Sequence, residues 1–239
     1  MFESMDTPYG GARAATALVG AALSAFAIWR MLAPKPPPPE PVAAQVVAVK
    51  GEVIAARLQG GVAVEPDAPA AVGRVVREED QFKIARDGLC RIQTADGSLV
   101  QLDAGDQSRG FLLVDRLTPG GGELGIALRE GRVMIRARPS LEWTVEADSR
   151  GGGGSNSARA SGKGATAIVV YAKGADALNV AVKEGQASVS PSLTTTSSIP
   201  VPAGHRVKLT AAFGDRPEVV PVDASDLDDL AGLDRPAGR

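Results

Sequence analysis

The hydrophobic and polar positions of this chain follow two different patterns. Residues 14–33 form one long apolar run, AATALVGAALSAFAIWRMLA, with no charge before Arg30. From residue 42 onward, apolar and polar residues alternate in short runs bounded by glycine, proline or aspartate, as they do in β-strands. The pattern predicts a single helix followed by a mainly β body.

The apolar run has the length of a transmembrane helix. At about 1.5 Å per residue it spans roughly 30 Å, the thickness of the hydrocarbon layer. Trp29 and Arg30 suit a membrane interface, where an indole lies among the headgroups and a guanidinium extends outward. The alternative is a cleaved signal peptide, because Ala25-Phe26-Ala27 has the small-x-small form of a cleavage site. Since the apolar character continues beyond that site, we expect the helix to be retained.

Small residues recur on one face of this helix at spacings of three and four. They are Ala17, Gly20, Ala21 and Ser24. Such a face lets membrane helices pack closely, which predicts docking on another integral membrane protein. The alternative is that an alanine-rich helix shows this spacing by chance. Basic residues do not decide the orientation of the helix in the membrane, because they occur on both sides. Arg13 lies before the run, Arg30 lies near its end and Lys35 follows it.

The remaining boundaries follow from composition. Residues 1–13 form a short tail, and the proline-rich residues 34–41 predict a stiff polyproline II spacer. The β domain is expected over 42–222. In the acidic tail, 223–239, Leu227, Leu230 and Leu233 are spaced by three after Ser225, which predicts a short surface helix capped by that serine.

Turn residues organise the predicted strands. Asp96-Gly97 between alternating runs is a strong hairpin signal, and Lys50-Gly51 gives a weaker, hairpin-like one. Gly131 and Gly185 occupy matching positions in LREGRV and VKEGQA, which predicts equivalent hairpin corners with special backbone angles. The glycine- and serine-rich residues 148–164 are interpreted as a long loop.

Several side chains on these strands have a predicted environment. Cys90, the single cysteine, alternates with apolar residues and is expected in the core, as is Trp143. The basic residues Arg132, Arg136 and Arg138 alternate with Val133, Ile135 and Ala137. This basic row is either a solvated sheet face or a surface for an acidic partner.

Six short elements, taken in order, resemble the FecR-type extracytoplasmic domain. Each joins a glycine turn to a strand, and together they cover most of the β body. They are Val49-Lys50-Gly51-Glu52-Val53, Asp96-Gly97-Ser98-Leu99-Val100-Gln101-Leu102, Leu128-Arg129-Glu130-Gly131-Arg132-Val133, Gly164-Ala165-Thr166-Ala167-Ile168-Val169, Lys183-Glu184-Gly185 and Ala203-Gly204-His205-Arg206-Val207. The resemblance implies a β-solenoid-like or β-sandwich fold on the periplasmic side of the inner membrane, used for protein contact. Family members also carry a cytoplasmic anti-sigma segment before the membrane helix, which we expect residues 1–13 to be too short to hold.

Composition argues against nucleic-acid, metal, phosphate and sugar binding. A net charge of -2 gives no basic footprint for nucleic acid. One histidine, His205, and one cysteine exclude zinc fingers and multi-histidine metal sites. The glycine runs lack the lysine-serine/threonine ending of a phosphate loop, and 4% aromatic residues leave little for a sugar site. We expect no catalytic residues, cofactor, metal or small-molecule substrate.

The expected function is therefore binding. We expect a single-pass inner-membrane protein of bacterial type whose β domain and membrane helix contact integral membrane proteins, as an accessory subunit of a larger complex. The alternative is a sensor or regulator of a cell-surface sigma/anti-sigma pathway. A hydrolase or carbohydrate-binding module has the least support.

Overall fold

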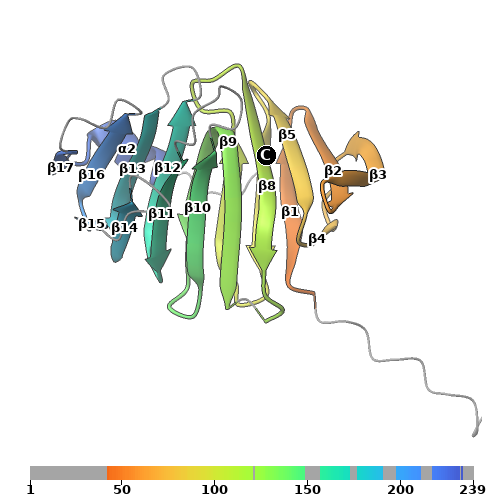
Figure 1. Cartoon of the computed structure of the whole chain (residues 1–239), viewed down its shortest axis with the longest axis horizontal. Coiled ribbons are helices and arrows are strands. Elements are labelled where there is room, and N and C mark those ends of the chain that lie inside the picture. The colour runs from red at the N-terminus through yellow and green to blue at the C-terminus, as the bar shows by residue number, and fades with distance from the viewer. Residues whose placement is uncertain are drawn as a thin grey trace, which may run out of the picture. The chain divides into compact units, whose positions relative to one another are not determined.

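The computed structural model describes residues 42–120, 122–148, 157–172, 177–190, 198–210, 217–231 and 233 (Figure 1). All of them belong to one compact unit, 41–239. The expectation of a mainly β body is confirmed. The predicted membrane helix at 14–33 and the spacer at 34–41 lie outside the described residues. Within the described ranges, no helix is both long and apolar enough to cross a membrane.

The strand registers define two sheets, here called sheet A and sheet B. Sheet A has the order β4 (Val75–Val76), β1 (Ala44–Lys50), β6 (Leu89–Thr94), β7 (Leu99–Asp103), β9 (Glu123–Arg136), β12 (Thr166–Ala172), β13 (Ala177–Glu184), β16 (His205–Thr210) and β17 (Val219–Pro221). Sheet B has the order β3 (Val62–Pro69), β2 (Val53–Gln59), β5 (Asp80–Ala85), β8 (Arg109–Leu117), β9, β10 (Glu142–Asp148), β11 (Ser157–Lys163), β14 (Gln186–Ser190) and β15 (Ile199–Pro202).

The long strand β9 belongs to both sheets. Its first part pairs with β8 and β10 in sheet B, and its second part pairs with β7 and β12 in sheet A. Gly131 lies at the change, with φ 110°. A Cβ at this position would lie 2.8 Å from the Asp103 carbonyl oxygen and 2.9 Å from the Gly110 Cα. Both neighbours are backbone atoms, so a glycine is required by space as well as by φ.

From the start of β9 to the start of β10 the chain makes one full turn, from sheet B to sheet A and back. It returns to sheet B through residues 137–141, and β10 then runs parallel to the start of β9, with Glu142 beside Glu123 and Trp143 beside Leu124. This pair is parallel, whereas the other described pairs are antiparallel. A parallel neighbour requires such a crossover connection, here made through the opposite sheet.

Other passages between the sheets are also made at glycines with positive φ. They are Gly51, Gly164, Gly185 and Gly204. The hairpin-like interpretation of Lys50-Gly51 is therefore wrong, because β1 pairs with β4 and β6 in sheet A while β2 pairs with β3 and β5 in sheet B. The matching positions of Gly131 and Gly185 likewise mark crossings and not hairpins. The Asp96-Gly97 hairpin is confirmed, since β6 and β7 are adjacent antiparallel strands.

The inner faces of the two sheets form one apolar core. Val100, Leu102 and Ile135 of sheet A belong to the same buried cluster as Phe82 and Leu128 of sheet B. Alternation along each strand places these side chains inside, as in two-layer β proteins. Most of the core consists of valine, alanine and leucine, so the two layers are held by many small contacts.

Cys90 and Trp143 both lie in this core, as the alternation predicts. Cys90 is fully buried, and burial raises the pKa of its thiol to about 12. The thiol is therefore neutral at physiological pH and has little nucleophilic character. Trp143 is also buried and faces Gly162, where an added Cβ would lie 2.7 Å from the indole.

Part of the predicted loop at 148–164 is a strand. Residues 157–163 form β11, which pairs along its whole length with β10 and on its other side with β14. Ala158 and Ala160 are buried, and Gly162 makes room for the Trp143 indole. The small residues that resemble a flexible linker therefore have the period of two that a strand packed on a tryptophan requires. Residues 149–156 lie outside the described set.

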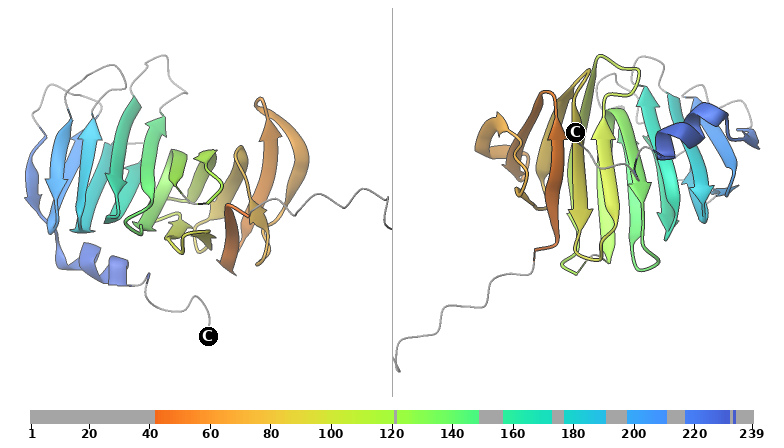
Figure 2. Two further views of the ribbon diagram at one scale, coloured as in Figure 1. Left: turned by 90° about the horizontal axis from the view of Figure 1, so that it is seen from below. Right: turned by 180° about the vertical axis from the view of Figure 1, so that it is seen from behind.

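A short helix, α2 (Ala224–Ala231), lies on the outer face of sheet A, as the view from behind shows (Figure 2). Leu230 and Leu233 pack there against Met134 and Ile168. The predicted surface helix is confirmed. Ser225 is not its cap, because the helix begins at Ala224 and the Asp223 carbonyl accepts a 3.3 Å hydrogen bond from the Leu227 amide.

Replacing Gly131 by alanine tests the crossing. We expect Gly131→Ala to lower the free energy of unfolding by about 3 kcal/mol, from positive φ together with the backbone clash. Gly204→Ala is the matched control, because Gly204 also crosses between sheets with φ 74° but has open space around its Cα. It should cost only about 1 kcal/mol. Urea denaturation measures both, and equal losses would contradict the packing argument.

Candidate interaction surface

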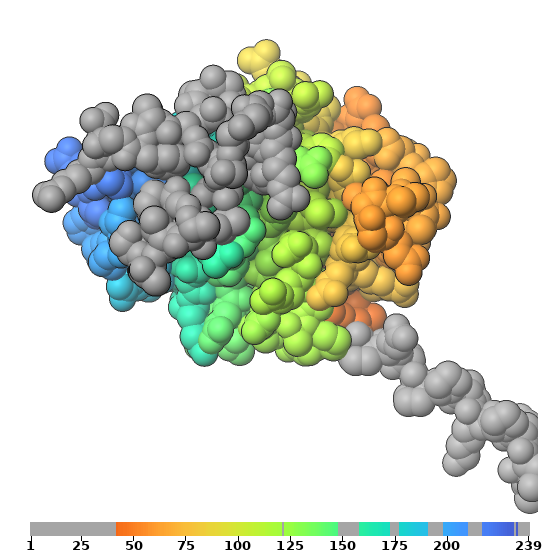
Figure 3. All heavy atoms as spheres, viewed as in Figure 1, coloured from red at the N-terminus to blue at the C-terminus, as the bar shows by residue number. Residues whose placement is uncertain are grey.

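The outer face of sheet B carries a groove near the passages between the sheets. Side chains of four neighbouring strands meet here, since the registers place Ile54 beside Lys83, Lys83 beside Phe111 and Phe111 beside Glu130. The groove has a volume of about 560 Å³. Its remaining lining is Glu52, Ile84, Ala85, Arg109, Gly110 and Arg129. In the space-filling view, atoms of β5, β8 and β9, coloured yellow to green, are exposed on this half of the face (Figure 3).

The floor of the groove is apolar and its rim is charged. The Arg129 guanidinium lies 5.0 Å from the centre of the Phe111 ring, a cation–π contact. Lys83 pairs with Asp67 at 2.6 Å, and Arg109 pairs with Glu130 at 3.1 Å. Among the described residues, Arg129 has no carboxylate partner, and its side chain is exposed. Protein-binding surfaces commonly combine an aromatic centre with a charged rim.

Exposed valines lie on the strand at the edge of the same sheet. Val62 and Val64 of β3 are 69% and 52% exposed, and β3 has a strand partner on one side, β2. Val72, in the connection from β3 to β4, is 66% exposed. This edge strand thus offers apolar side chains to solvent, and Val62 lies beside Gln59, at the other end of β2 from Ile54 of the groove.

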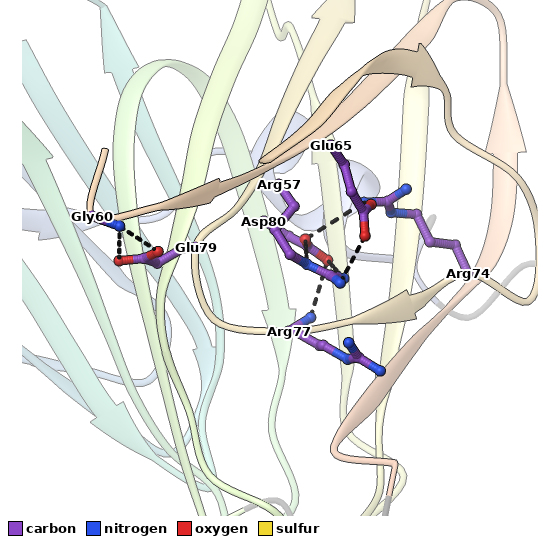
Figure 4. A network of polar contacts seen from close by, with 7 residues as sticks. All are labelled: Arg57, Gly60, Glu65, Arg74, Arg77, Glu79 and Asp80. Carbon is purple, nitrogen blue, oxygen red and sulfur yellow. Dashed lines mark hydrogen bonds and ion pairs between the residues drawn. The ribbon is translucent and has the colours of Figure 1, made fainter. Parts of the chain in front are cut away.

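A partly buried ionic network fixes β3 against the body (Figure 4). Asp80 is fully buried and accepts hydrogen bonds from Arg57 Nε at 3.0 Å and from the Arg77 amide at 3.1 Å. Glu65 of β3 accepts from Arg57 at 2.8 Å and from Arg74 at 3.1 Å. Two arginines and two carboxylates therefore join β2, β3, β5 and the segment before β4.

A second contact ties down the tip of the β2–β3 hairpin. Glu79 has φ 66°, an uncommon value for a residue with a side chain. Its carboxylate accepts a 3.0 Å hydrogen bond from the Gly60 amide, at the turn between the two strands (Figure 4). The local strain at Glu79 is thus associated with holding the hairpin in place.

Neither the groove nor the network was predicted from the sequence. The groove depends on the register of four strands, which a single sequence does not give. The sequence contains one indication of the network. Asp80 has the same inward-facing position in the alternation as Phe82 and Ile84. A charged residue at a position that predicts burial indicates a buried ion pair.

The predicted site residues divide into two groups. The membrane-helix residues Ala17, Gly20, Ala21 and Ser24, and the interfacial residues Trp29 and Arg30, lie outside the described part of the chain. The turn residues Gly51, Asp96, Gly97, Gly131 and Gly185 lie in turns or crossings and do not line the groove, although Gly51 and Gly131 adjoin the lining residues Glu52 and Glu130. In the described ranges, acidic, histidine and cysteine side chains form no cluster of three arranged to hold a metal ion.

The predicted basic row is partly neutralised within the chain. Arg132 donates to Asp103 at 2.8 Å and also pairs with Asp229 of α2. Burial works to lower the pKa of Arg132, but the hydrogen bond and charge of Asp103, with those of Asp229, outweigh it and hold that pKa above its ordinary value. At this position the row is neither a solvated face nor an open surface for an acidic partner.

Asp96 is the best-bonded carboxylate of the predicted turns. It accepts hydrogen bonds from Thr94 Oγ1 at 2.6 Å, the Ser98 amide at 3.0 Å, Ser98 Oγ at 3.0 Å and Ser140 Oγ at 2.8 Å. Partial burial works to raise the pKa of Asp96, but these bonds to the charged form outweigh it and hold that pKa below its ordinary value.

Comparison with protein-family models gives no match, and comparison with curated protein sequences gives none. Among solved structures, two crystal structures of a candidate anti-sigma factor from Parabacteroides distasonis, at 1.65 Å and 2.50 Å resolution, are similar to this chain. Both are 13% identical to it, with TM-scores of 0.47 and 0.46. The alignments cover 63% of this chain and 64% and 63% of the other, so the match spans less than two thirds of that protein's length.

Asp80→Ala tests the ionic network. Removing the carboxylate leaves Arg57 and Arg74 without their buried partner, so we expect a loss of about 3 kcal/mol in the free energy of unfolding. Asp67→Ala is the control, because it breaks an exposed pair with Lys83 and should cost about 0.5 kcal/mol. Urea denaturation distinguishes the two, and a small loss for Asp80→Ala would show that the network does not stabilise the fold.

Asp96→Asn tests the pKa of the hairpin carboxylate. A lowered pKa in the folded state stabilises the protein above the ordinary pKa, and this contribution is lost as pH falls through the folded-state value. We therefore expect Asp96→Asn to have a lower Tm than the unaltered chain at about pH 6, and the difference to shrink toward about pH 3. Thermal unfolding followed by circular dichroism measures it. A difference that grows on acidification would be incompatible with the lowered pKa.

Proposed function

We propose that this chain is a membrane-anchored, extracytoplasmic protein-binding module, and that it acts as an accessory subunit of a larger membrane complex. The observation that carries the proposal is the groove on sheet B. Phe111 and Ile54 give it an apolar floor, and Arg129 offers a cation without a carboxylate partner among the described residues. The proposed role is binding without catalysis.

The membrane anchor and the periplasmic position are parts of the proposal that rest on the sequence. Residues 14–33 have the length and apolarity of a membrane helix, and Ala17, Gly20, Ala21 and Ser24 give it a close-packing face. The proline-rich residues 34–41 would hold the β body away from the bilayer. The integral membrane partner would then be contacted twice, by the helix and by the body.

A second candidate is a sensor or regulator of a cell-surface sigma/anti-sigma pathway. It is supported by the ordered glycine elements that resemble the FecR-type domain. In this fold, Gly51, Gly131, Gly164, Gly185 and Gly204 of those elements all lie where the chain passes between the sheets. Five of the six elements therefore share one structural role, while Asp96-Gly97 forms a hairpin within sheet A, and this supports the resemblance in fold more than the pathway.

Affinity purification of the full-length chain from native membranes tests the proposal. We expect gentle detergent extraction to recover a stoichiometric integral membrane complex, identified by mass spectrometry. Arg129→Glu should reduce recovery of the partner at least about tenfold, because it reverses the groove cation that has no carboxylate partner among the described residues and removes the contact with Phe111.

Arg116→Glu is the matched control for this experiment. Arg116 lies on β8, its side chain is 64% exposed and it does not line the groove. The same charge change there should leave recovery unaltered. Recovery of a sigma factor or an outer-membrane receptor would favour the second candidate, and full recovery with both variants would exclude the groove as the binding surface.

A further inference from the structure

The outer face of sheet A is covered by α2 through a contact separate from the main core. Leu230 and Leu233 are each 1% exposed and form a small cluster with Met134 and Ile168, with Val170 at its border. None of these residues belongs to the large cluster between the sheets. The helix can therefore leave without opening the core.

The surface under α2 is an apolar strip on a face that would ordinarily be polar. Met134 of β9 lies beside Ile168 of β12, and Ala181 of β13 lies beside Ile168 on the other side. Ala181 is also buried, at 6% exposure. In an antiparallel sheet with one solvated face, these positions would be polar. Three adjoining strands thus form a seat for apolar side chains.

Two arginines bracket this strip and hold the helix by its carboxylates. Arg206 of β16 pairs with Asp223 and, at 3.4 Å, with Asp226. Arg132 of β9 pairs with Asp229. The helix itself carries three aspartates and no basic residue. Charge complementarity therefore fixes both ends of the seat for an acidic helix.

The attachment of α2 is weak by the standards of the rest of the fold. A helix of eight residues is shorter than the 12–15 or so that an isolated helix needs, so it depends on its contact with the sheet. That contact rests on two leucines and on ion pairs, and the pairs made by Arg206 are partly exposed, so salt screens them.

We propose that α2 is a detachable strap, and that the surface it covers binds an acidic helix of a partner protein with leucines spaced by three. α2 and its flanking residues Asp223 and Leu233 show which occupant fits: two leucines over Met134 and Ile168, and carboxylates toward Arg132 and Arg206. This surface lies on the sheet opposite to the groove, so the inference goes beyond the proposed function and is tested independently of it.

A receiver variant of the full-length chain tests the seat directly. In Leu230→Ser/Leu233→Ser, α2 loses its apolar contact with Met134 and Ile168. The seat is then free to bind an added peptide. The probe is a fluorescein-labelled peptide of residues 222–233, followed by fluorescence anisotropy. We expect saturable binding to the receiver and much weaker binding to the unaltered chain, whose own α2 occupies the seat.

Two controls separate the seat from nonspecific association. Adding Arg206→Glu to the receiver should weaken peptide binding about tenfold, because two carboxylates then face a negative charge. A peptide in which both leucines are serine should not bind. Circular dichroism establishes that each receiver is folded, and a folded receiver that binds no peptide would overturn the proposal.

Hydrogen exchange on the unaltered chain tests detachment without any variant. The amides of Leu227 to Ala231 should exchange at least about a hundredfold faster than those of β12, through local opening of the strap, and faster still in about 1 M salt. Exchange of α2 at the rate of β12 would show that it opens only with the whole fold, against the proposal. If the chain formed dimers by exchanging α2, the surface under α2 would bind a second copy of this chain, and the proposal of a different partner protein would be overturned.

Discussion

The passage of β9 from one sheet to the other depends on a backbone contact that admits no side chain. Gly131 lies against the Asp103 carbonyl and the Gly110 Cα, and beyond it the strand continues in sheet A. All described pairings between strands before β9 and strands after it are made through β9 itself. The β1–β8 half and the β10–β17 half of the body are therefore joined by one strand. If that strand could not turn at Gly131, neither sheet would be continuous.

This arrangement places two unlike surfaces on opposite sides of the same strand. Before Gly131, Arg129 contributes to the groove on sheet B, and after it, Arg132 and Met134 contribute to the seat of α2 on sheet A. The groove has no helix over it among the described residues, whereas the seat is occupied by the chain's own helix. One face is thus available at once, and the other only when α2 leaves.

Much of the local structure follows from the sequence, and much of the topology does not. The Asp96-Gly97 hairpin, the buried Cys90 and Trp143 and the helix around Leu230 follow from short-range patterns. The sequence around Gly51 predicts a hairpin-like turn, because a glycine between two apolar runs looks the same whether the second strand stays in the sheet or crosses. The glycines and serines before Lys163 do not indicate β11 in the sequence, because small residues that pack on a tryptophan have the same composition as a flexible linker. The groove needs the register of Ile54, Lys83, Phe111 and Arg129, which lie up to 75 residues apart in the sequence and are aligned only by strand pairing.

The coil formed by β9, residues 137–141 and β10 has a consequence for how this chain can change in length. A residue inserted or deleted near Gly131 would turn every following side chain of the strand to the opposite face, because the side chains of a strand alternate with a period of two. Met134 would then face the core and Ile135 the helix, and the parallel alignment of Glu142 with Glu123 would be lost. A connection that returns within one sheet, such as the one joining β6 to β7, does not have to keep its length for this reason. Insertions, tags and grafted peptides therefore belong in the hairpin connections, and the crossings must keep their length.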